Sequence, residues 1–199
     1  MVNKKKVTIG VLSYQGSVEE HLSMLSRLED VLPMPVKTEE QLHQVDGIIL
    51  PGGESTTIAR LLNVFGLMEP LRNRIQQGMP VWGTCAGMIL LAKHIRGERP
   101  HLGVMDIVVR RNAYGRQIDS FEDQAVIPQV SPDPIPLVFI RAPWIDRVDG
   151  NTQVLLQLDG HIVAALERNM LATSFHPELT QCTAFHRYFT DLVREWEKQ

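Results

Sequence analysis

The chain has 199 residues, of which 44% are hydrophobic, and a formal net charge of -3 at pH 7. This length and apolar content allow a sizeable core, in one large domain or two small ones at roughly 150 residues per domain. The slightly acidic balance argues against a general nucleic-acid binder. The basic run Lys4-Lys5-Lys6 is interpreted as a solvated tail before the first strand.

The cysteines and the N-terminal residues indicate the cellular location of the protein and whether it binds a metal. Cys85 and Cys182 are too few for a disulfide framework, and no Cys-x-x-Cys or His/Cys cluster suggests a zinc site. The charged start leads into a strand of about six residues, which is not the pattern of a signal peptide. No stretch approaches the roughly 18 apolar residues of a membrane span. We therefore expect a cytoplasmic protein that binds no metal, membrane or nucleic acid.

In the first half of the chain, predicted strands alternate with predicted helices. Continuous apolar runs at residues 7–12, 47–50 and 79–82 are typical of strands buried on both faces. Apolar residues at helical spacing follow them at residues 18–28, 57–65, 68–76 and 88–93. This alternation predicts an α/β fold with a doubly wound, mostly parallel central sheet flanked by helices.

The middle of the chain lacks helices of comparable strength. Strands are predicted at residues 104–109, 117–121 and 137–140, and Pro128, Pro132, Pro134 and Pro136 are expected to break this segment. We therefore expect a small antiparallel or mixed extension at the edge of the sheet.

The last third of the chain returns to clear patterns. Asp159-Gly160 between two apolar runs predicts a hairpin, and residues 170–174 predict another buried strand. An apolar stripe along residues 185–196 predicts a helix that faces the core. Because no linker or internal repeat divides the chain, residues 1–199 are predicted to form a single domain.

Cys85 lies in Gly83-Thr84-Cys85-Ala86-Gly87, between a predicted strand and a predicted helix. A Gly-x-Cys-x-Gly turn in this context is typical of a nucleophile elbow. The glycines permit a sharp turn and leave room for a substrate, and the start of a helix favours a thiolate. The pentapeptide alone also fits a small core residue in a tight turn.

His176 directly follows a predicted strand and is followed by Pro177 and Glu178. The proline favours an extended His176, and in an extended segment Glu178 would point to the same side and orient the imidazole. Taken alone, the segment also fits a turn with a solvated carboxylate. With a cysteine elbow at the end of a neighbouring strand, it predicts a Cys–His–Glu triad. No acidic partner at a suggestive spacing is found for the other histidines, which are His21, His43, His94, His101, His161 and His186.

The turn Pro-Gly-Gly-Glu-Ser at residues 51–55 ends another predicted strand. A backbone N–H of this turn and the N–H of Ala86 could together form an oxyanion hole. Ser55 or Thr56 is expected to cap the following helix. A phosphate site is the alternative, but the turn lacks both the Gly-Lys-Ser/Thr ending of a P-loop and the Gly-x-Gly-x-x-Gly of a dinucleotide site.

These three segments together resemble the class I, triad-type glutamine amidotransferases, whose fold is flavodoxin-like. Further short segments of the sequence resemble one branch of that family, the glutaminase subunits of pyridoxal 5'-phosphate synthases. These matches lie at residues 10–12, 15–16, 111–112, 115–117, 119–121, 139–143 and 179–180, and the resemblance runs from about residue 7 to residue 195. Ser13-Tyr14 departs from the smaller or aliphatic residues usual in the family and could alter a contact surface.

The resemblance implies a role for each site residue. Cys85 would attack the side-chain amide of L-glutamine, and His176, oriented by Glu178, would manage the protons. Gly53 and the N–H of Ala86 would stabilise the tetrahedral oxyanion, without any cofactor. The implied glutamine-binding positions are Gly53, Glu54, Ser55, Arg111, Ile140 and Arg141. An arginine suits the carboxylate of glutamine, although the residues alone do not decide which arginine this is.

The resemblance also implies a separate partner, because free ammonia is easily lost and the glutaminase occupies the whole chain. That partner would be the barrel-shaped synthase subunit of pyridoxal 5'-phosphate synthase, in a hetero-oligomer. Docking is expected to activate the glutaminase. Two alternatives remain at this point: the glutaminase subunit of another synthase, and a non-catalytic redox or binding module that uses Cys85 as an oxidisable thiol and needs neither His176 nor Glu178.

Overall fold

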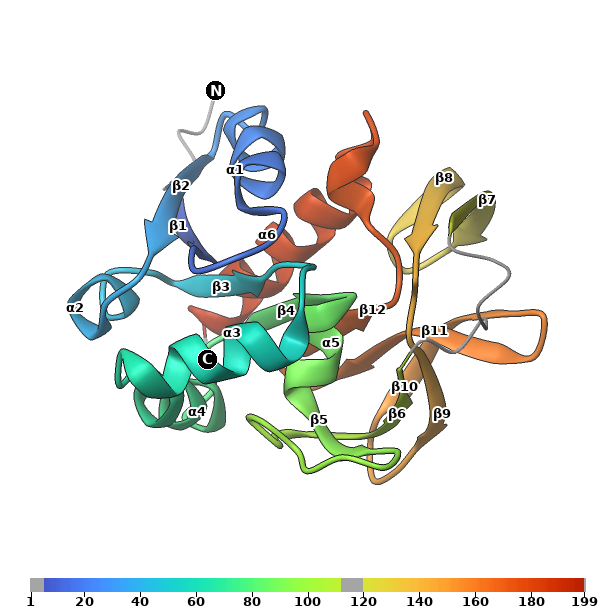
Figure 1. The fold of residues 1–199 in the computed structure, drawn as a ribbon. Coiled ribbons are helices and arrows are strands. Elements are labelled where there is room, and N and C mark those ends of the chain that lie inside the picture. Colours follow the sequence, from blue (N-terminus) through green and yellow to red (C-terminus); the bar gives the residue numbers. More distant parts are fainter. Residues whose placement is uncertain (1–5, 112–119, 199) are drawn as a thin grey trace.

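The structure is a computed structural model that describes residues 6–111 and 120–198. A ten-stranded sheet forms its centre (Figure 1). In spatial order, its strands are β2 (Val31–Val36), β1 (Val7–Leu12), β3 (Gly47–Leu50), β4 (Val81–Thr84), β12 (Met170–Thr173), β11 (His161–Glu167), β9 (Trp144–Val148), β6 (Met105–Arg110) and β5 (Ala92–Ile95), with β10 (Gln153–Leu158) paired to β11.

The sheet is parallel on one side and largely antiparallel on the other. Strands β2, β1, β3, β4 and β12 all run in the same direction. From β12 onward, β11, β9 and β6 pair antiparallel, and β5 returns to a parallel pairing with β6. The α/β architecture and its antiparallel extension are therefore confirmed. The hairpin predicted at Asp159-Gly160 is β10–β11.

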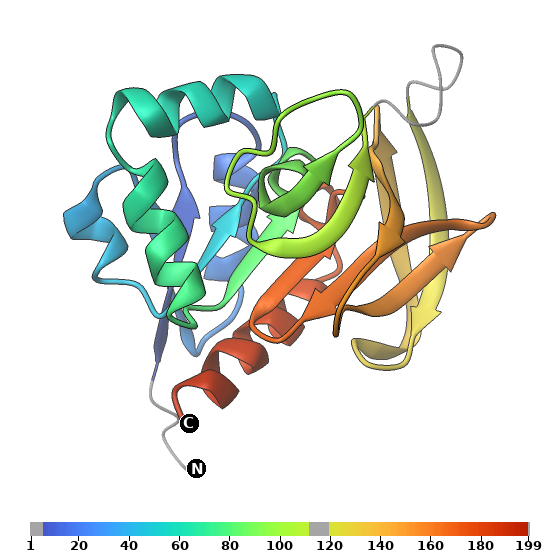
Figure 2. The same cartoon turned by 90° about the horizontal axis from the view of Figure 1, so that it is seen from below.

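Helices cover both faces of the parallel part, so the core has two layers (Figure 2). One face is covered by α2 (Glu39–Leu42), α3 (Ser55–Val64), α4 (Met68–Gln76) and α5 (Ala86–Leu91), and the other by α1 (Val18–Ser26) and α6 (Ala184–Trp196). Successive residues of β3 serve the two layers in turn, since Ile48 and Leu50 join the first cluster and Ile49 the second.

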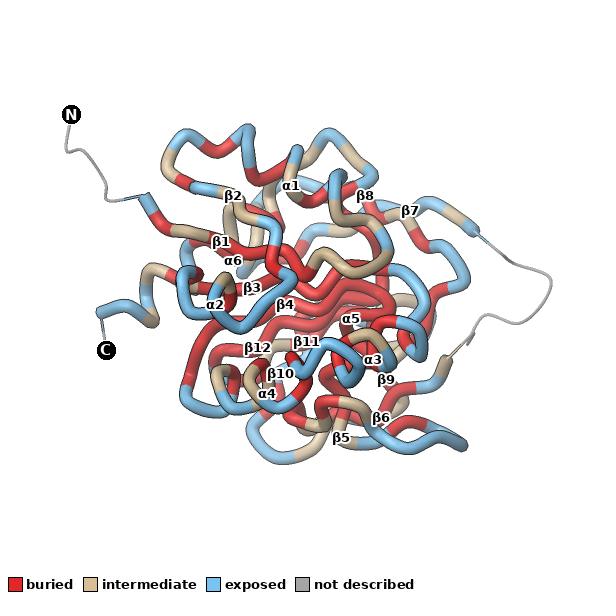
Figure 3. The backbone as a smooth tube through the Cα atoms, turned by 60° about the vertical axis from the view of Figure 1, so that its left-hand side comes forward, coloured by how far each residue is buried: buried red, intermediate tan, exposed pale blue. Residues whose placement is uncertain are grey.

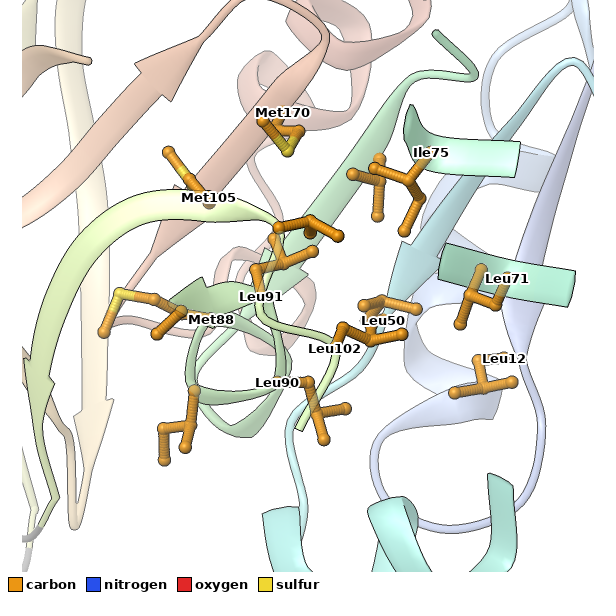
Figure 4. Packing of buried hydrophobic residues seen from close by; sticks show 14 of the residues in the cluster. Leu12, Leu50, Leu71, Ile75, Met88, Leu90, Leu91, Leu102, Met105 and Met170 are labelled. Atoms are coloured by element: carbon orange, nitrogen blue, oxygen red, sulfur yellow. The ribbon is translucent and has the colours of Figure 1, made fainter. Parts of the chain in front are cut away.

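The parallel strands are buried along their length, which explains their continuous apolar sequences. Figure 3 shows the buried residues concentrated in the sheet, with exposed residues on the outer sides of the helices. In the first layer, Leu50 of β3 packs among Leu90 of α5, Leu71 of α4 and Leu102 (Figure 4). A sheet held between two apolar layers is a rigid base for side chains at its edge.

Several elements differ from the sequence-based expectation. Strands β2 and β9 and the short helix α2 are additional, and residues 92–95 are strand β5 rather than the end of a helix. Strand β8 (Ser131–Ile140) runs through three of the four prolines that were expected to break the segment. Within the described residues, it pairs only with β7 (Ser120–Ile127), and such an edge strand leaves room for residues that lack an N–H. The strand predicted at residues 117–121 lies partly outside the described residues.

The two-stranded sheet β7–β8 packs onto the core beside the C-terminal end of β12. Phe121 and Phe139 stack with ring centroids 4.5 Å apart, and Phe139 meets Phe175 edge to face at 5.6 Å. The N–H of His176 donates to the carbonyl of Val138 over 2.8 Å. The extension therefore holds the segment that carries His176. None of the helices in the described parts of the chain is long and apolar enough to cross a membrane.

Candidate active site

Four neighbouring parallel strands end at the same edge of the sheet. The segments that follow β1, β3, β4 and β12 carry Gln15, Gly52, Cys85 and His176, respectively. Backbone hydrogen bonds tie these segments together: Ser17 N–H donates to the Gly52 carbonyl over 3.0 Å, and Cys85 N–H donates to the Thr173 carbonyl over 2.8 Å. The carboxyl ends of parallel strands are where such folds form their sites.

Cys85 alone separates β4 from α5 and adopts φ 49° and ψ −103°, a conformation that residues other than glycine rarely take. A side chain on Gly87 would overlap the Leu50 carbonyl, so the close packing of α5 on β3 requires glycine there. The Cys85 side chain is 8% exposed, and its sulfur lies 4.0 Å from the carbonyl oxygen of Ile140. The structure therefore has the sharp turn expected of a nucleophile elbow.

His176 and Glu178 meet as the sequence predicts, through a 2.7 Å contact between Nδ1 and Oε1. The backbone route differs from the expectation, because residues Pro177–Leu179 form a 3₁₀ turn instead of an extended segment. The turn brings the carboxylate back beneath the imidazole. Both residues are buried, with 7% of His176 and 4% of Glu178 exposed.

The electrostatics of this pair favour a charged histidine. Burial by itself would lower the pKa of His176, but hydrogen bonds to Cys85 and Glu178 outweigh burial and raise the pKa to about 10. Burial would raise the pKa of Glu178, yet His21, His176 and Ser17 together lower it to about 2. An imidazolium between a thiol and a carboxylate lets the sulfur attack as a thiolate and the ring later release its proton.

The proposed oxyanion donors are backbone N–H groups of Ala86, directly after the cysteine, and of the turn that follows β3. Ala86 is the first residue of α5, so its N–H has no carbonyl in a preceding helical turn. The N–H of Glu54 donates to Gln15 Oε1 over 2.8 Å. Among residues 6–111 and 120–198, no acceptor is paired with the N–H of Gly53. The N–H of Glu54 is therefore occupied, whereas in the described part of the chain those of Ala86 and Gly53 are the free donors that an oxyanion hole would need.

Helix α3 begins without the cap that the sequence predicts. Its N-cap residue is Glu54, and no side chain caps the helix. The Ser55 hydroxyl is buried without a hydrogen-bond partner in the described structure, and Thr56 Oγ1 donates to Glu54 Oε1 over 3.2 Å. The expectation of a Ser55 or Thr56 cap is therefore wrong.

The predicted glutamine-binding positions lie around the same edge. Arg111 donates to the carboxylates of Glu54 and Glu98, each over 2.7 Å. Ile140 presents its carbonyl to the cysteine, and Arg141 is exposed with φ 43°. The structure brings Glu54 and Arg111 into contact, so one acidic and one basic group stand together near the elbow.

Two buried contacts of the triad were missed in the sequence. Ser17 Oγ donates to Glu178 Oε1 over 2.7 Å, and His21 Nε2 lies 3.5 Å from Glu178 Oε2. Spacing along the sequence indicated no acidic partner for His21, and the fold supplies one from a distant segment. A signal was present, since Ser17 and His21 are four residues apart at the start of a predicted helix and so share one face.

Within the described residues, no group of three or more His, Cys, Asp or Glu side chains could hold a metal ion. Comparison with known proteins identifies the family of the chain. The model of the SNO glutamine amidotransferase family matches residues 11–195.

Three similar proteins show how far this likeness extends. The chain is 56% identical to pyridoxal 5'-phosphate synthase subunit PdxT of Ruminiclostridium cellulolyticum, over 93% of its own length and 98% of that relative. The subunit of the same name from Streptomyces coelicolor is 52% identical, over 94% and 93% of the two chains. A crystal structure of a glutamine amidotransferase is 41% identical, with a TM-score of 0.87 and coverage of 94% and 98%.

Proposed function

Because the chain belongs to the SNO glutamine amidotransferase family, we propose that it hydrolyses L-glutamine as the glutaminase subunit of a pyridoxal 5'-phosphate synthase. The products are L-glutamate and ammonia. The observation that carries this function is the Cys85 elbow beside a buried His176 that Glu178 holds at 2.7 Å. A nucleophile, a base and an orienting carboxylate are the parts that acyl transfer requires.

Each residue has a distinct part in the reaction. The thiolate of Cys85 attacks the side-chain amide carbon, and the N–H groups of Gly53 and Ala86 stabilise the resulting oxyanion. When the carbon–nitrogen bond breaks, His176 gives a proton to the leaving ammonia, and a γ-glutamyl thioester remains on the sulfur. His176 then takes a proton from water, which attacks the thioester and releases glutamate. Glu178 keeps the ring oriented throughout.

The substrate is held by its own charges. Arg111 suits the α-carboxylate of glutamine and Glu54 its α-ammonium group, since they carry the opposite charges. Their 2.7 Å contact supports this pairing, because the two opposite charges lie next to each other. Gly53, Ser55, Ile140 and Arg141 complete the proposed binding positions.

A second protein, the synthase subunit, uses the ammonia. The relatives from Ruminiclostridium cellulolyticum and Streptomyces coelicolor are named as subunits of a pyridoxal 5'-phosphate synthase. This chain accordingly works with the synthase subunit in a hetero-oligomer, which we place in the cytoplasm. We also propose that residues 1–199 act as one glutaminase domain.

Two measurements test this function. Ammonia release from L-glutamine is measured with and without the synthase subunit, for the wild type and for His176→Ala. We expect the synthase to stimulate the wild type and the variant to lose its activity, so full activity of the variant would contradict the triad. A glutamine-analogue affinity label, followed by mass spectrometry, should modify Cys85 and leave Cys182 as the internal control. Labelling of Cys182 instead would contradict the assigned nucleophile.

A further inference from the structure

Glu178 has two carboxylate oxygens with different surroundings. Oε1 accepts hydrogen bonds from His176 Nδ1 and from the hydroxyl of Ser17, each over 2.7 Å. Oε2 is buried, and within the described residues no hydrogen bond of standard geometry reaches it. The ring nitrogen Nε2 of His21 lies 3.5 Å from it, and both side chains are completely buried. A buried carboxylate oxygen requires a partner that carries positive or partial positive charge.

His21 belongs to a buried pair of histidines behind the triad. Its Nδ1 lies 3.0 Å from Nε2 of His186 on α6, and its Nε2 lies 3.2 Å from Oγ1 of Thr84. Trp82 packs edge-on against both imidazole rings, with centroids 5.6 Å and 5.0 Å away. Burial lowers the pKa of His21 and of His186, so both rings are neutral near pH 7. Between two neutral rings, one nitrogen of this contact carries the proton and the other accepts it, so the donor is either His21 Nδ1–H or His186 Nε2–H.

The surroundings decide between the two tautomer arrangements. If His21 carried its proton on Nδ1, the lone pair on Nε2 would face the Glu178 carboxylate, and within the described residues the Thr84 hydroxyl would be its hydrogen-bond donor. His186 would then hold a buried Nδ1–H, although this nitrogen has no hydrogen-bond partner among the described residues. The opposite arrangement avoids both costs: His186 Nε2–H donates to His21 Nδ1, and the proton on His21 Nε2 lies beside Thr84 Oγ1 at 3.2 Å and Glu178 Oε2 at 3.5 Å. It leaves only an unprotonated, unpaired nitrogen on His186.

We infer that His21 is a positioning residue of the glutaminase, which holds the Glu178 carboxylate from behind through its Nε2–H and is itself kept in that tautomer by His186. Glu178 is thereby fixed at both oxygens without a second positive charge beside His176. The inference rests on the proposed function, since it concerns the same triad. It extends the machinery by two residues that lie behind the triad and are sealed from the substrate.

A matched pair of substitutions separates this role from packing. In His21→Gln, the carboxamide nitrogen stands near the place of imidazole Nε2 and can still donate towards Glu178. In His21→Asn, it stands near the place of Nδ1 and faces His186 instead. Both variants bury the same polar group. We expect His21→Gln to keep at least a third of the wild-type kcat for glutamine hydrolysis in complex with the synthase. We expect His21→Asn to lower kcat about 10- to 100-fold with the glutamine KM unchanged, because a buried carboxylate oxygen loses the polar group that faces it.

A second readout does not depend on glutamine. The rate of Cys85 alkylation by iodoacetamide at pH 7, resolved by peptide mass spectrometry, reports how well His176 supports the thiolate. It should fall in His21→Asn and hold in His21→Gln. If wild-type protein with the synthase released no ammonia while alkylation still separated the two variants, the proposed function would fail, and the support that His21 gives to Glu178 would still be shown.

Equal kcat and equal alkylation rates in the two His21 variants, whether high or low, would overturn the inference, because the position of the donor would then not matter. Thermal unfolding shows whether each variant is folded. If neither variant folds, the same comparison moves one residue outward, to His186→Gln and His186→Asn. The glutamine variant keeps a donor at the Nε2 position and should again retain the higher kcat. Equal kcat at His186 would likewise overturn the inference.

Discussion

Replacing Gly52 by alanine tests how tightly the proposed triad is held. A methyl group at this position would lie less than 3.0 Å from Cε1 of His176, 3.0 Å from its Nδ1 and 3.5 Å from Cβ of Cys85. Carbon atoms in ordinary contact are about 3.5–4.0 Å apart, so the imidazole must retreat by roughly 1 Å. A displacement of that size in a reacting group costs about 100-fold in rate, or about 2.7 kcal/mol in the activation barrier.

The assay is ammonia release by the complex with the synthase, with kcat and KM measured for wild type and Gly52→Ala. We expect kcat to fall about 100-fold. Because the methyl group overpacks a buried site, the variant should also lose about 1–3 kcal/mol of folding stability, and thermal unfolding should show it folded at the assay temperature. A wild-type kcat would refute the reasoning, since it would mean that the His176 ring is not held where the structure places it.

Gly66→Ala is the matched control. Gly66 follows α3 with φ 69°, and an added methyl group would meet no atom within 4 Å. Alanine in this left-handed conformation costs about 1 kcal/mol of folding free energy, or about 2–4 °C in Tm. Activity at a permissive temperature should be unchanged. The two alanines thus separate an effect on catalysis from an effect on stability.

Two further predictions concern charged groups. Arg111→Ala should raise the glutamine KM at least about tenfold, because a charge-assisted contact to the substrate carboxylate is lost. The control is Arg110, whose guanidinium pairs with Asp146; Arg110→Ala should keep the glutamine KM within about twofold of wild type. Equal effects of the two substitutions would contradict the role of Arg111 in binding the substrate carboxylate. The other prediction concerns Asp30. Burial would raise the pKa of this carboxyl group, but hydrogen bonds from Arg187 and Arg194 lower the pKa to about 2. This carboxylate therefore stabilises the fold above about pH 4, and the contribution is lost as the pH falls towards 2. Asp30→Asn should unfold about 1–2 kcal/mol more easily at pH 6 in urea, and the difference should narrow by pH 3.5; a constant difference would rule out this linkage.

Local patterns in the sequence predict the elements whose burial is regular along their length. Strands β1 and β3 and helix α4 have the bounds that their apolar runs indicate, and α6 follows its apolar stripe. The two strands are predictable because both of their faces are buried, and the two helices because buried residues recur at helical spacing along one face. Strand β2, with Pro33 and Pro35 at the sheet edge, has no such pattern, since one side of an edge strand has no pairing to satisfy.

The sequence by itself determined the chemistry of the site, because a nucleophile elbow and a His-Pro-Glu segment are each written in five or fewer consecutive residues. Only the tertiary structure decided what surrounds that chemistry. The 3₁₀ turn at Pro177 set how Glu178 reaches His176, and α1 brought His21 to its far oxygen across more than 150 positions of sequence. Contacts between distant segments depend on how the elements pack around the sheet, and no local pattern of residues specifies that packing.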